Sequence, residues 1–224
     1  MTPLTRMLHH AIVAEIGVNH FGSVTEAMAL VDQASQAGAN FAKFQMFVTS
    51  ELVSESSHEW SVRMEPKELS KAQMLDVRQY CAEVGIPFAC TAHDYDSLEF
   101  VAGSLDVAFV KIGSGELRNW EFIKAACRTG LPVVVSTGMY LKEDILKLVA
   151  LLEAFQNLDF ALMHANTAYP TAYVEANLSW ISFLKEVTAV PVGFSDHTES
   201  ELAASVAVGL GATFCERHIT RRKN

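Results

Sequence analysis

Apolar residues recur along this chain in eight short runs that are rich in β-branched and aromatic side chains. Runs of this kind, bounded by glycine, proline or polar residues, are typical of strands buried on both faces. The eight predicted strands cover residues 12–18, 41–47, 87–92, 107–113, 132–138, 159–165, 191–197 and 212–219.

Longer stretches with a helical period lie between these runs. Several of them end at a glycine shortly before the next strand, as at Gly85 and Gly130, which is a common way for a helix to stop. Strict alternation of buried strands and helices indicates a parallel sheet. The predicted helices cover residues 25–37, 68–84, 97–102, 120–128, 142–155, 178–187 and 199–208, with 97–102 the shortest.

Eight strand–helix units predict an α/β fold of the (β/α)₈ TIM-barrel type, which typically needs about 250 residues. The alternative is an open doubly wound sheet, which usually has fewer strands and a glycine-rich first turn. Residues 17–22 read GVNHFG and do not match G-x-G-x-x-G, so we prefer the barrel. No helix is expected after the eighth strand. The outer flank of the first and last strands is then partly bare, unless the N-terminal segment or a partner covers it.

Composition limits the class of protein. The chain has 224 residues, of which half are hydrophobic and 19% charged, which suits one globular domain. A membrane span needs roughly 18 apolar residues in a row, and no run is that long. The start of the chain does not resemble a secretion leader, and the four cysteines form no C-x-x-C pair, so we expect a reducing, cytoplasmic location. A net charge of −9 argues against nucleic acid as a partner.

Polar side chains gather where the predicted strands end, which is where barrel enzymes place their sites. Lys43 and Lys111 are the strongest signals, because an unpaired ammonium group inside an apolar strand is costly to bury. The alternative is that each lysine only balances a carboxylate of the barrel. The candidate site residues are Glu15, Lys43, Gln45, Thr91, Lys111, Ser114, Ser136, Thr167, Tyr169, Ser195, His197, Glu216 and His218.

Hydroxyl groups near the two lysines suggest a site for an anion. Thr91, Ser114 and Ser136 follow predicted strands, and the backbone N–H groups of 113–115 and 137–138 could add to a phosphate cradle. Hydroxyls at strand ends also commonly cap the next helix, so each one alone is weak.

The last two predicted strands end in Ser-Asp-His and Glu-Arg-His. Because side chains alternate along a strand, Ser195 shares a face with His197, and Glu216 shares a face with His218. If these strands are parallel neighbours, the two imidazoles converge and could hold a divalent metal. The alternative is that they only satisfy hydrogen bonds. Glu15 would lie beside the eighth strand of a closed barrel, as a metal ligand, a base or a partner for a lysine. An anion site beside a metal site suggests a phosphorylated substrate and an electrophile held by the metal.

Seven motifs follow one another along the chain: AEIGVNH at 14–20, KFQ at 43–45, KIGSGE at 111–116, STGM at 136–139, YP at 169–170, GFSDHT at 193–198 and ERHIT at 216–220. Together and in this order they closely resemble the sialic acid synthase family, which includes N-acetylneuraminate synthase and its legionaminic and pseudaminic acid relatives. The resemblance runs from about residue 12 to residue 220.

This resemblance implies a TIM barrel that condenses phosphoenolpyruvate with an N-acetylated amino-sugar aldehyde and needs Mn²⁺ or Mg²⁺. It implies that His197 and His218 bind the metal and act in catalysis, and that Glu15 sits at the reacting centre. Gln45 and Tyr169 would contact the sugar, with Thr167 and Glu216 as further substrate contacts. Phosphoenolpyruvate would be held by Lys43, Thr91, Lys111, Ser114, Ser136 and Ser195.

Departures from the family pattern are local until the end of the chain. After the sixth strand the family commonly has His-Cys-Thr, whereas this chain has His-Ala-Asn-Thr at 164–167, so either Asn166 or Thr167 could supply the hydrogen bond there. After the third strand Thr91 is kept and the usual following proline is lost.

The family continues beyond the last matched motif with a final helix and a small antifreeze-like domain that takes part in a homodimer. We therefore expect one TIM-barrel domain over residues 1–224, truncated at its C-terminus and without the antifreeze-like domain. A homodimer is a further expectation that this shortening weakens. Two alternatives stay open: a remnant that binds phosphoenolpyruvate or metal with little turnover, and an enzyme like 3-deoxy-octulosonate phosphate synthase.

Overall fold

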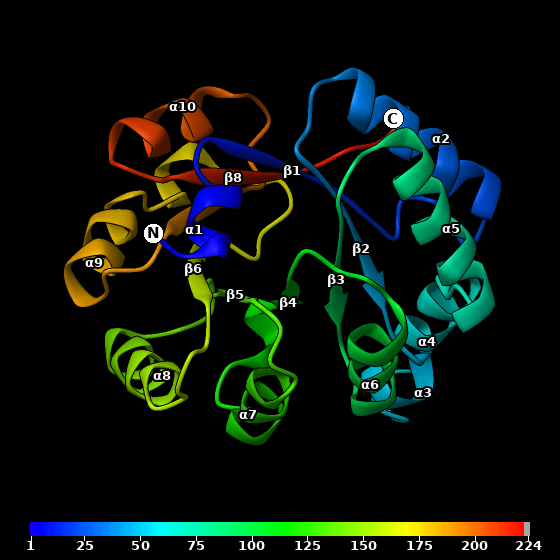
Figure 1. The fold of residues 1–224 in the computed structure, drawn as a ribbon, viewed down its shortest axis with the longest axis horizontal. Helices are drawn as coiled ribbons and strands as arrows, with labels where there is room; N and C mark the ends of the chain where they lie inside the picture. Colours follow the sequence, from blue (N-terminus) through cyan, green and yellow to red (C-terminus); the bar gives the residue numbers. More distant parts are fainter. Residues whose placement is uncertain (222–224) are drawn as a thin grey trace. The chain divides into compact units, whose positions relative to one another are not determined.

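A computed structural model describes residues 1–221. It confirms the predicted fold, because eight parallel strands follow one another in sequence order and close into a TIM barrel, with helices between them (Figure 1). The strands are β1 Ala11–Gly17, β2 Phe41–Met46, β3 Phe88–Ala92, β4 Val110–Ile112, β5 Val133–Ser136, β6 Phe160–Ala165, β7 Val192–Asp196 and β8 Phe214–His218.

All seven predicted helices are present, and the structure adds short ones that the sequence pattern did not predict. Among the described residues, no helix follows β8, and none anywhere is long and apolar enough to cross a membrane. The expectation for the chain end lies partly on residues 222–224, outside the described residues. The α-helices are α1 Pro3–Met7, α2 Val24–Gln36, α3 Thr49–Leu52, α4 His58–Met64, α5 Lys71–Val84, α6 Tyr95–Ser104, α7 Trp120–Arg128, α8 Lys142–Glu153, α9 Ser179–Val187 and α10 Leu202–Gly209. The 3₁₀ turns are η1 Glu65–Lys67, η2 Ser114–Glu116 and η3 Tyr173–Glu175.

The chain falls into two compact units. The first comprises Met1–Ile12 and Lys111–Arg217, and the second comprises Val13–Val110 together with the described residues from His218 onward.

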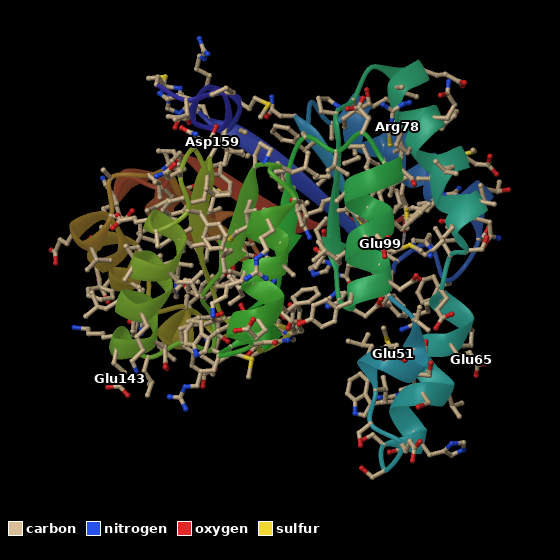
Figure 2. The ribbon with its side chains drawn as sticks, turned by 60° about the horizontal axis from the view of Figure 1, so that its bottom comes forward. Glu51, Glu65, Arg78, Glu99, Glu143 and Asp159 are labelled. Carbon is tan, nitrogen blue, oxygen red and sulfur yellow. The ribbon has the colours of Figure 1, made fainter. Side chains whose placement is uncertain are left out.

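The N-terminal helix α1 of the first unit was not predicted. Its N-cap Thr2 accepts a hydrogen bond from the amide of Thr5, and Pro3 occupies the first helical position, where its missing N–H costs nothing. Asp159, before β6, lies beside α1 (Figure 2). Its carboxylate accepts hydrogen bonds from the Thr2 hydroxyl (2.6 Å) and the Leu4 amide (2.8 Å). Leu4 and Leu8 are fully buried. Asp159 therefore fastens α1 to the start of β6.

Three apolar side chains of the first unit are exposed: Ile12, at 48%, and Leu202 and Val206 of α10. The partly bare outer flank beside the first and last strands stays a prediction.

In the second unit, α2 and α5 pack side by side (Figure 1). Helix α5 begins at Lys71 rather than at residue 68, because Ser70 and Gln73 form a capping box that fixes its start. It ends at Gly85, whose φ of 81° needs a residue without a Cβ atom. The unpredicted helix α4 buries none of its residues, so it leaves no apolar period in the sequence.

Strand β4 is shorter than the predicted 107–113. It spans only Val110–Ile112, although the Ala108 amide still donates to the Phe88 carbonyl of β3. Register then decides which side chains meet. Glu15 lies opposite Lys43 across β1 and β2, and Gln45 lies opposite Thr91 across β2 and β3.

Candidate functional site

The second unit holds a buried ion pair between facing residues of β1 and β2. The Lys43 ammonium lies 2.5 Å from Oε2 of Glu15, and both side chains are only 3% exposed. Lys43 also donates to the Thr91 hydroxyl (3.0 Å), and the Gln45 amide donates to Oε1 of Glu15 (2.6 Å). The structure thus brings together four predicted site residues, which we call the β1–β3 cluster: Glu15, Lys43, Gln45 and Thr91.

Gly17 leaves room for this cluster. Its φ is +55°, and a Cβ atom there would lie 3.0 Å from Oε1 of Glu15 and 3.1 Å from Nε2 of Gln45. Glycine suits both the conformation and the space. Burying two charges is costly unless further hydrogen bonds satisfy them, and Gln45 and Thr91 supply such bonds. Lys43 therefore does balance a carboxylate of the barrel, which is the alternative given in the sequence analysis. That Lys43 also contacts a ligand stays a prediction.

The first unit holds the second predicted lysine. Lys111 is 3% exposed, and its ammonium donates to the Ser136 hydroxyl (2.6 Å) and to the Ile112 carbonyl (3.1 Å). Nearby in the chain, the Ser114 hydroxyl accepts a hydrogen bond from the Gly138 amide (3.0 Å). We call Lys111, Ser114 and Ser136 the β4–β5 cluster.

The expected backbone part of a phosphate cradle is wrong for residues 137–138. The Thr137 amide donates to the Met163 carbonyl, and the Gly138 amide donates to Ser114, so both N–H groups already serve the fold. Gly138 is also packed tightly, because a Cβ atom there would lie 2.8 Å from the Ala165 carbonyl oxygen. The amides of residues 113–115 stay a prediction as the backbone part of an anion site.

The ends of β7 and β8 carry a third group of predicted residues, Ser195, His197 and Glu216, which we call the β7–β8 cluster. Nδ1 of His197 lies 2.5 Å from the Asn166 carbonyl oxygen, and the Ser195 hydroxyl lies 3.2 Å from Nε2. Oε1 of Glu216 is a second acceptor within reach of the Ser195 hydroxyl (3.4 Å), whose single proton serves one of the two acceptors at a time. The exposed ring of Tyr169 lies 4.0 Å from the His197 ring, between centroids.

This arrangement determines which nitrogen of His197 carries the proton. A carbonyl oxygen only accepts hydrogen bonds, so the proton of the neutral ring sits on Nδ1 and the lone pair on Nε2. A backbone carbonyl behind the ring is also how metal-binding histidines are commonly oriented. An imidazole nitrogen beside a buried carboxylate offers one nitrogen and one oxygen donor, of which the oxygen is the kind of ligand that Mg²⁺ and Mn²⁺ prefer.

The remaining predicted residues are placed as follows. His218 belongs to the second unit and is exposed, so its pairing with His197 stays a prediction. Thr167 is exposed, and the Asn166 side chain is engaged with the Ala168 amide and the Glu175 carbonyl. Within residues 1–221, no group of three or more His, Cys, Asp or Glu side chains is placed to hold a metal ion. The metal prediction therefore rests on the donors of His197 and its neighbours.

Two features of this region were missed by the sequence reasoning. The Asn166 carbonyl is a backbone group, and its partner follows only from the fold. Asp196 and Arg217 lie opposite each other in the β7–β8 register, between the predicted ligands. Opposite charges at matching positions of two neighbouring strands are a signal that could have been found in the sequence.

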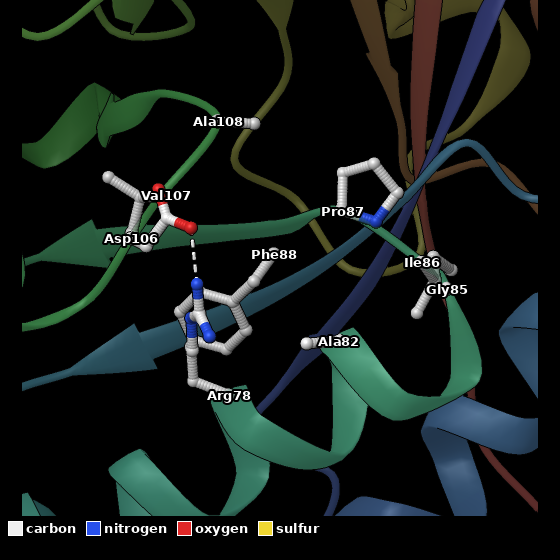
Figure 3. Close-up of a pocket in the computed structure, with 9 residues that line it drawn as sticks. All are labelled: Arg78, Ala82, Gly85, Ile86, Pro87, Phe88, Asp106, Val107 and Ala108. Atoms are coloured by element: carbon white, nitrogen blue, oxygen red, sulfur yellow. Dashed lines mark hydrogen bonds and ion pairs between the residues drawn. The ribbon is translucent and has the colours of Figure 1, made fainter.

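A pocket of about 300 Å³ opens in the second unit at the amino end of β3 (Figure 3). Apolar residues such as Ile86 and Phe88 line it, and an ion pair joins Arg78 to Asp106. None of the predicted site residues lines it, and in TIM barrels the amino ends of the strands mainly serve stability.

Comparison with known proteins gives the same family as the motifs. The NeuB family model matches residues 30–224. The chain is 37% identical over 226 residues to N-acetylneuraminate-9-phosphate synthase of Drosophila melanogaster, covering 95% of this chain and 60% of that protein. It is 31% identical over 230 residues to N,N'-diacetyllegionaminic acid synthase of Legionella pneumophila, covering 95% of this chain and 64% of that one.

A solved structure agrees. The crystal structure of N-acetylneuraminic acid synthetase from Leptospira borgpetersenii, in complex with citrate, matches with a TM-score of 0.91 and 31% identity. That match covers 96% of this chain and 74% of the other. The chain spans less than two thirds of the length of the Drosophila melanogaster and Legionella pneumophila relatives. With the family model matching most of its length, the chain belongs to the NeuB family.

Proposed function

We propose that this chain condenses phosphoenolpyruvate with an N-acetylated amino-sugar aldehyde, such as N-acetylmannosamine, to form a sialic-type acid and release phosphate. Family membership supports a phosphoenolpyruvate-dependent synthase in general. The buried Glu15–Lys43 pair carries the finer proposal, because it sets a carboxylate and an ammonium group side by side in two neighbouring barrel strands.

Phosphoenolpyruvate is an anion, and the two buried lysines are proposed to bind it. Lys43 and Lys111 are each held by hydroxyl groups, Thr91 and Ser136, which fix the direction of the ammonium groups. The other side chains proposed to contact it are Ser114 and Ser195. Pre-oriented cations lower the cost of ordering a charged ligand and keep its reacting carbon in position.

In the proposed reaction, C3 of phosphoenolpyruvate attacks the aldehyde carbon of the sugar, which forms the new C–C bond. The attack leaves an alkoxide on the sugar and an electron-poor C2, to which water adds while Glu15 accepts one of its protons and passes it to the alkoxide. The tetrahedral intermediate then collapses: the C2–O bond to phosphate breaks, phosphate leaves with the bond electrons and takes the proton of the C2 hydroxyl, and C2 becomes a carbonyl. A divalent metal held by His197 and His218 would stabilise the negative charge that develops on the aldehyde oxygen. The lysines oppose the charge of the phosphate throughout.

The sugar is proposed to contact Gln45, Thr167, Tyr169 and Glu216. Tyr169 is 65% exposed, so its ring offers an open apolar surface beside His197. Glu216 is buried and can accept hydrogen bonds from sugar hydroxyls. Gln45 donates to Glu15, so it also orients the proposed base.

The proposal extends to the setting in which the chain acts. The four cysteines are free and buried, which fits the reducing cytoplasm. A homodimer, as the family resemblance implies, is the proposed assembly of this chain.

Phosphate release is the first test. With Mn²⁺, phosphoenolpyruvate and N-acetylmannosamine, the chain should release phosphate, and His197→Ala should abolish the release. Binding of phosphoenolpyruvate without phosphate release for any amino sugar would identify a remnant that binds without turnover and would overturn the proposal.

Lys111 gives the second test. Lys111→Ala should raise KM for phosphoenolpyruvate far more than KM for the sugar, because the ammonium group is proposed to face the anion. Lys147→Ala, which removes an exposed lysine of the same unit, is the matched control and should change neither. Equal losses for both substrates would show that Lys111 is structural.

A further inference from the structure

An ion pair that the proposed reaction does not use joins β7 to β8. Asp196 and Arg217 lie opposite each other in the strand register, one position beyond Ser195 and Glu216. Because side chains alternate, this pair faces away from the β7–β8 cluster. Oδ2 of Asp196 accepts from Nη1 of Arg217 at 2.9 Å, and the Asp196 side chain is fully buried while that of Arg217 is 34% exposed.

The guanidinium group binds more than the carboxylate. Nη1 of Arg217 also donates to the Ser200 carbonyl (2.7 Å), and Nη2 donates to the Thr198 carbonyl (2.9 Å). Oδ1 of Asp196 accepts from both the amide and the hydroxyl of Thr198, at 2.9 and 2.7 Å. Residues 196–200 therefore form a turn wrapped around the end of one arginine side chain, which we call the Arg217 turn.

His197 is part of the Arg217 turn, between Asp196 and Thr198. Its own carbonyl accepts from the Thr171 amide (2.8 Å), and Nδ1 of its ring contacts the Asn166 carbonyl. The ring thus depends on two supports, the Asn166 carbonyl on one side and the Arg217 turn on the other. If the turn moved, the contact to Asn166 that selects the tautomer would be lost.

We propose that Arg217 is a positioning residue that holds the Arg217 turn, so that His197 keeps its proton on Nδ1 and presents Nε2 beside Ser195 and Glu216. The effect of this positioning role on turnover rests on the proposed function, whereas its effect on the ring of His197 does not.

The chemistry of arginine suits this task. The planar guanidinium group has five donors in a fixed fork, and here they reach one carboxylate and two carbonyls that lie in different directions. A lysine could keep the contact to Asp196, but its single nitrogen cannot fix the same fork. The variant Arg217→Lys therefore keeps the positive charge and removes the fixed fork of donors.

The tautomer of His197 provides the test. Long-range ¹H–¹⁵N spectra of the full 224-residue chain without metal, at about pH 8, where a histidine of ordinary pKa is neutral, distinguish the two ring nitrogens. His197→Gln assigns the signal by its disappearance. In the wild type we expect Nε2 to be unprotonated in one dominant tautomer. In Arg217→Ala and Arg217→Lys we expect a mixture of tautomers, and added guanidinium ion should restore the wild-type pattern in Arg217→Ala.

Arg118→Ala is the matched control. Arg118 also pairs through two nitrogens with a buried aspartate of the first unit, Asp144, and it is not part of the Arg217 turn. This variant should leave the His197 signals unchanged. If Arg217→Lys, which keeps the charge, melts at a lower temperature but retains the single tautomer, Arg217 is only a structural staple and the inference is overturned. The lysine variant decides the question if Arg217→Ala does not fold.

Phosphate release adds an independent measure. Loss of a group that orients a metal-binding histidine typically weakens metal affinity roughly 10–100-fold. We expect Arg217→Lys to raise the Mn²⁺ concentration for half-maximal rate by about this factor, with a smaller change in KM for phosphoenolpyruvate. An unchanged Mn²⁺ requirement would contradict the inference. A wild type without phosphate release would overturn the proposed function instead, and the tautomer result would still decide the role of Arg217.

Discussion

The β1–β3 cluster and the end of β7 and β8 each bury a carboxylate against a cation, yet they use different cations on different sides of the strands. In the β1–β3 cluster the pair is Glu15 with Lys43, and both partners belong to the proposed site. At β7 and β8 the pair is Asp196 with Arg217, and it faces away from the proposed ligands.

The choice of cation follows from the task. An ammonium group is a compact charge that can turn from a carboxylate toward a bound anion, which suits Lys43 beside a substrate. A guanidinium group holds several oxygens in a fixed geometry, which suits Arg217 behind a turn. Under the two proposals, one buried ion pair serves chemistry while the other sets the position of a neighbour.

The largest expected effect comes from separating the partners of the β1–β3 cluster. Glu15→Gln should lower the rate of phosphate release roughly 10²–10⁴-fold, the range typical for loss of a general base. It should also lower the free energy of unfolding by about 3 kcal/mol, because Lys43 is left buried without its carboxylate. Steady-state kinetics and urea unfolding measure the two losses.

The double variant sharpens this result. Glu15→Gln combined with Lys43→Met removes both charges, so it should regain most of the lost stability and none of the activity. If the stability losses of Glu15→Gln and Lys43→Met simply add in the double variant, the two side chains are not coupled. Glu15 and Lys43 would then not form an ion pair comparable to Asp196 and Arg217.

A buried histidine near the β1–β3 cluster predicts a pH dependence. His20 is 1% exposed, and burial lowers its pKa to about 4, an effect only partly offset by a backbone hydrogen bond at Gly17. Between the usual pKa near 6.5 and pH 4, the unfolded chain therefore binds more protons than the folded one. Stability should be full above pH 6.5 and fall by up to roughly 3 kcal/mol as the pH drops to 4.

Urea midpoints across this pH range measure the loss. His20→Gln should flatten the curve, because Gln does not titrate and its carbonyl oxygen can accept from the Gly22 amide as Nδ1 does. His58→Gln, at an exposed position of the same unit, should leave the curve unchanged. His164 of the first unit also has a pKa lowered by burial, so part of the acid loss should persist in His20→Gln. A wild-type curve identical to that of His20→Gln would rule out the role of His20.

The smallest expected effect concerns packing beside the β7–β8 cluster. A Cβ atom on Gly193 would lie 2.4 Å from the Phe214 ring, so Gly193→Ala should cost about 1–3 kcal/mol of stability through overpacking. Gly209→Ala is the control in the same unit, because nothing lies within 4 Å of its added methyl group. Thermal melts that lower Tm equally in both would contradict this account.

The sequence predicted the barrel well because its strands are buried on both faces and leave an unbroken apolar signal. Helix ends were less accurate, since a cap such as Ser70 with Gln73 sets the first residue of α5 while the apolar period only sets its extent. Helix α4 left no signal because it buries nothing. Helix α1 had one, Thr2 followed by Pro3, in a stretch too short for periodicity.

In the candidate site, too, part of the structure leaves a sequence pattern and part does not. Lysines in apolar strands and polar strand ends indicated Lys43, Lys111 and His197, and register then placed their neighbours. The sequence did not reveal that Gln45 donates to Glu15, nor that the Gly138 amide is already engaged with Ser114. Such bonds depend on side-chain rotamers and on backbone groups, which leave no pattern of their own.

The attachment of α1 through Asp159 matters for anyone who produces this protein. A purification tag on Met1, which is 85% exposed, extends from the surface and leaves the Thr2 and Leu4 bonds intact. Removing the first eight residues would instead take both donors from the Asp159 carboxylate and remove the fully buried side chains of Leu4 and Leu8. A poor yield of such a shortened chain would then reflect the lost attachment of α1 and would say nothing about activity.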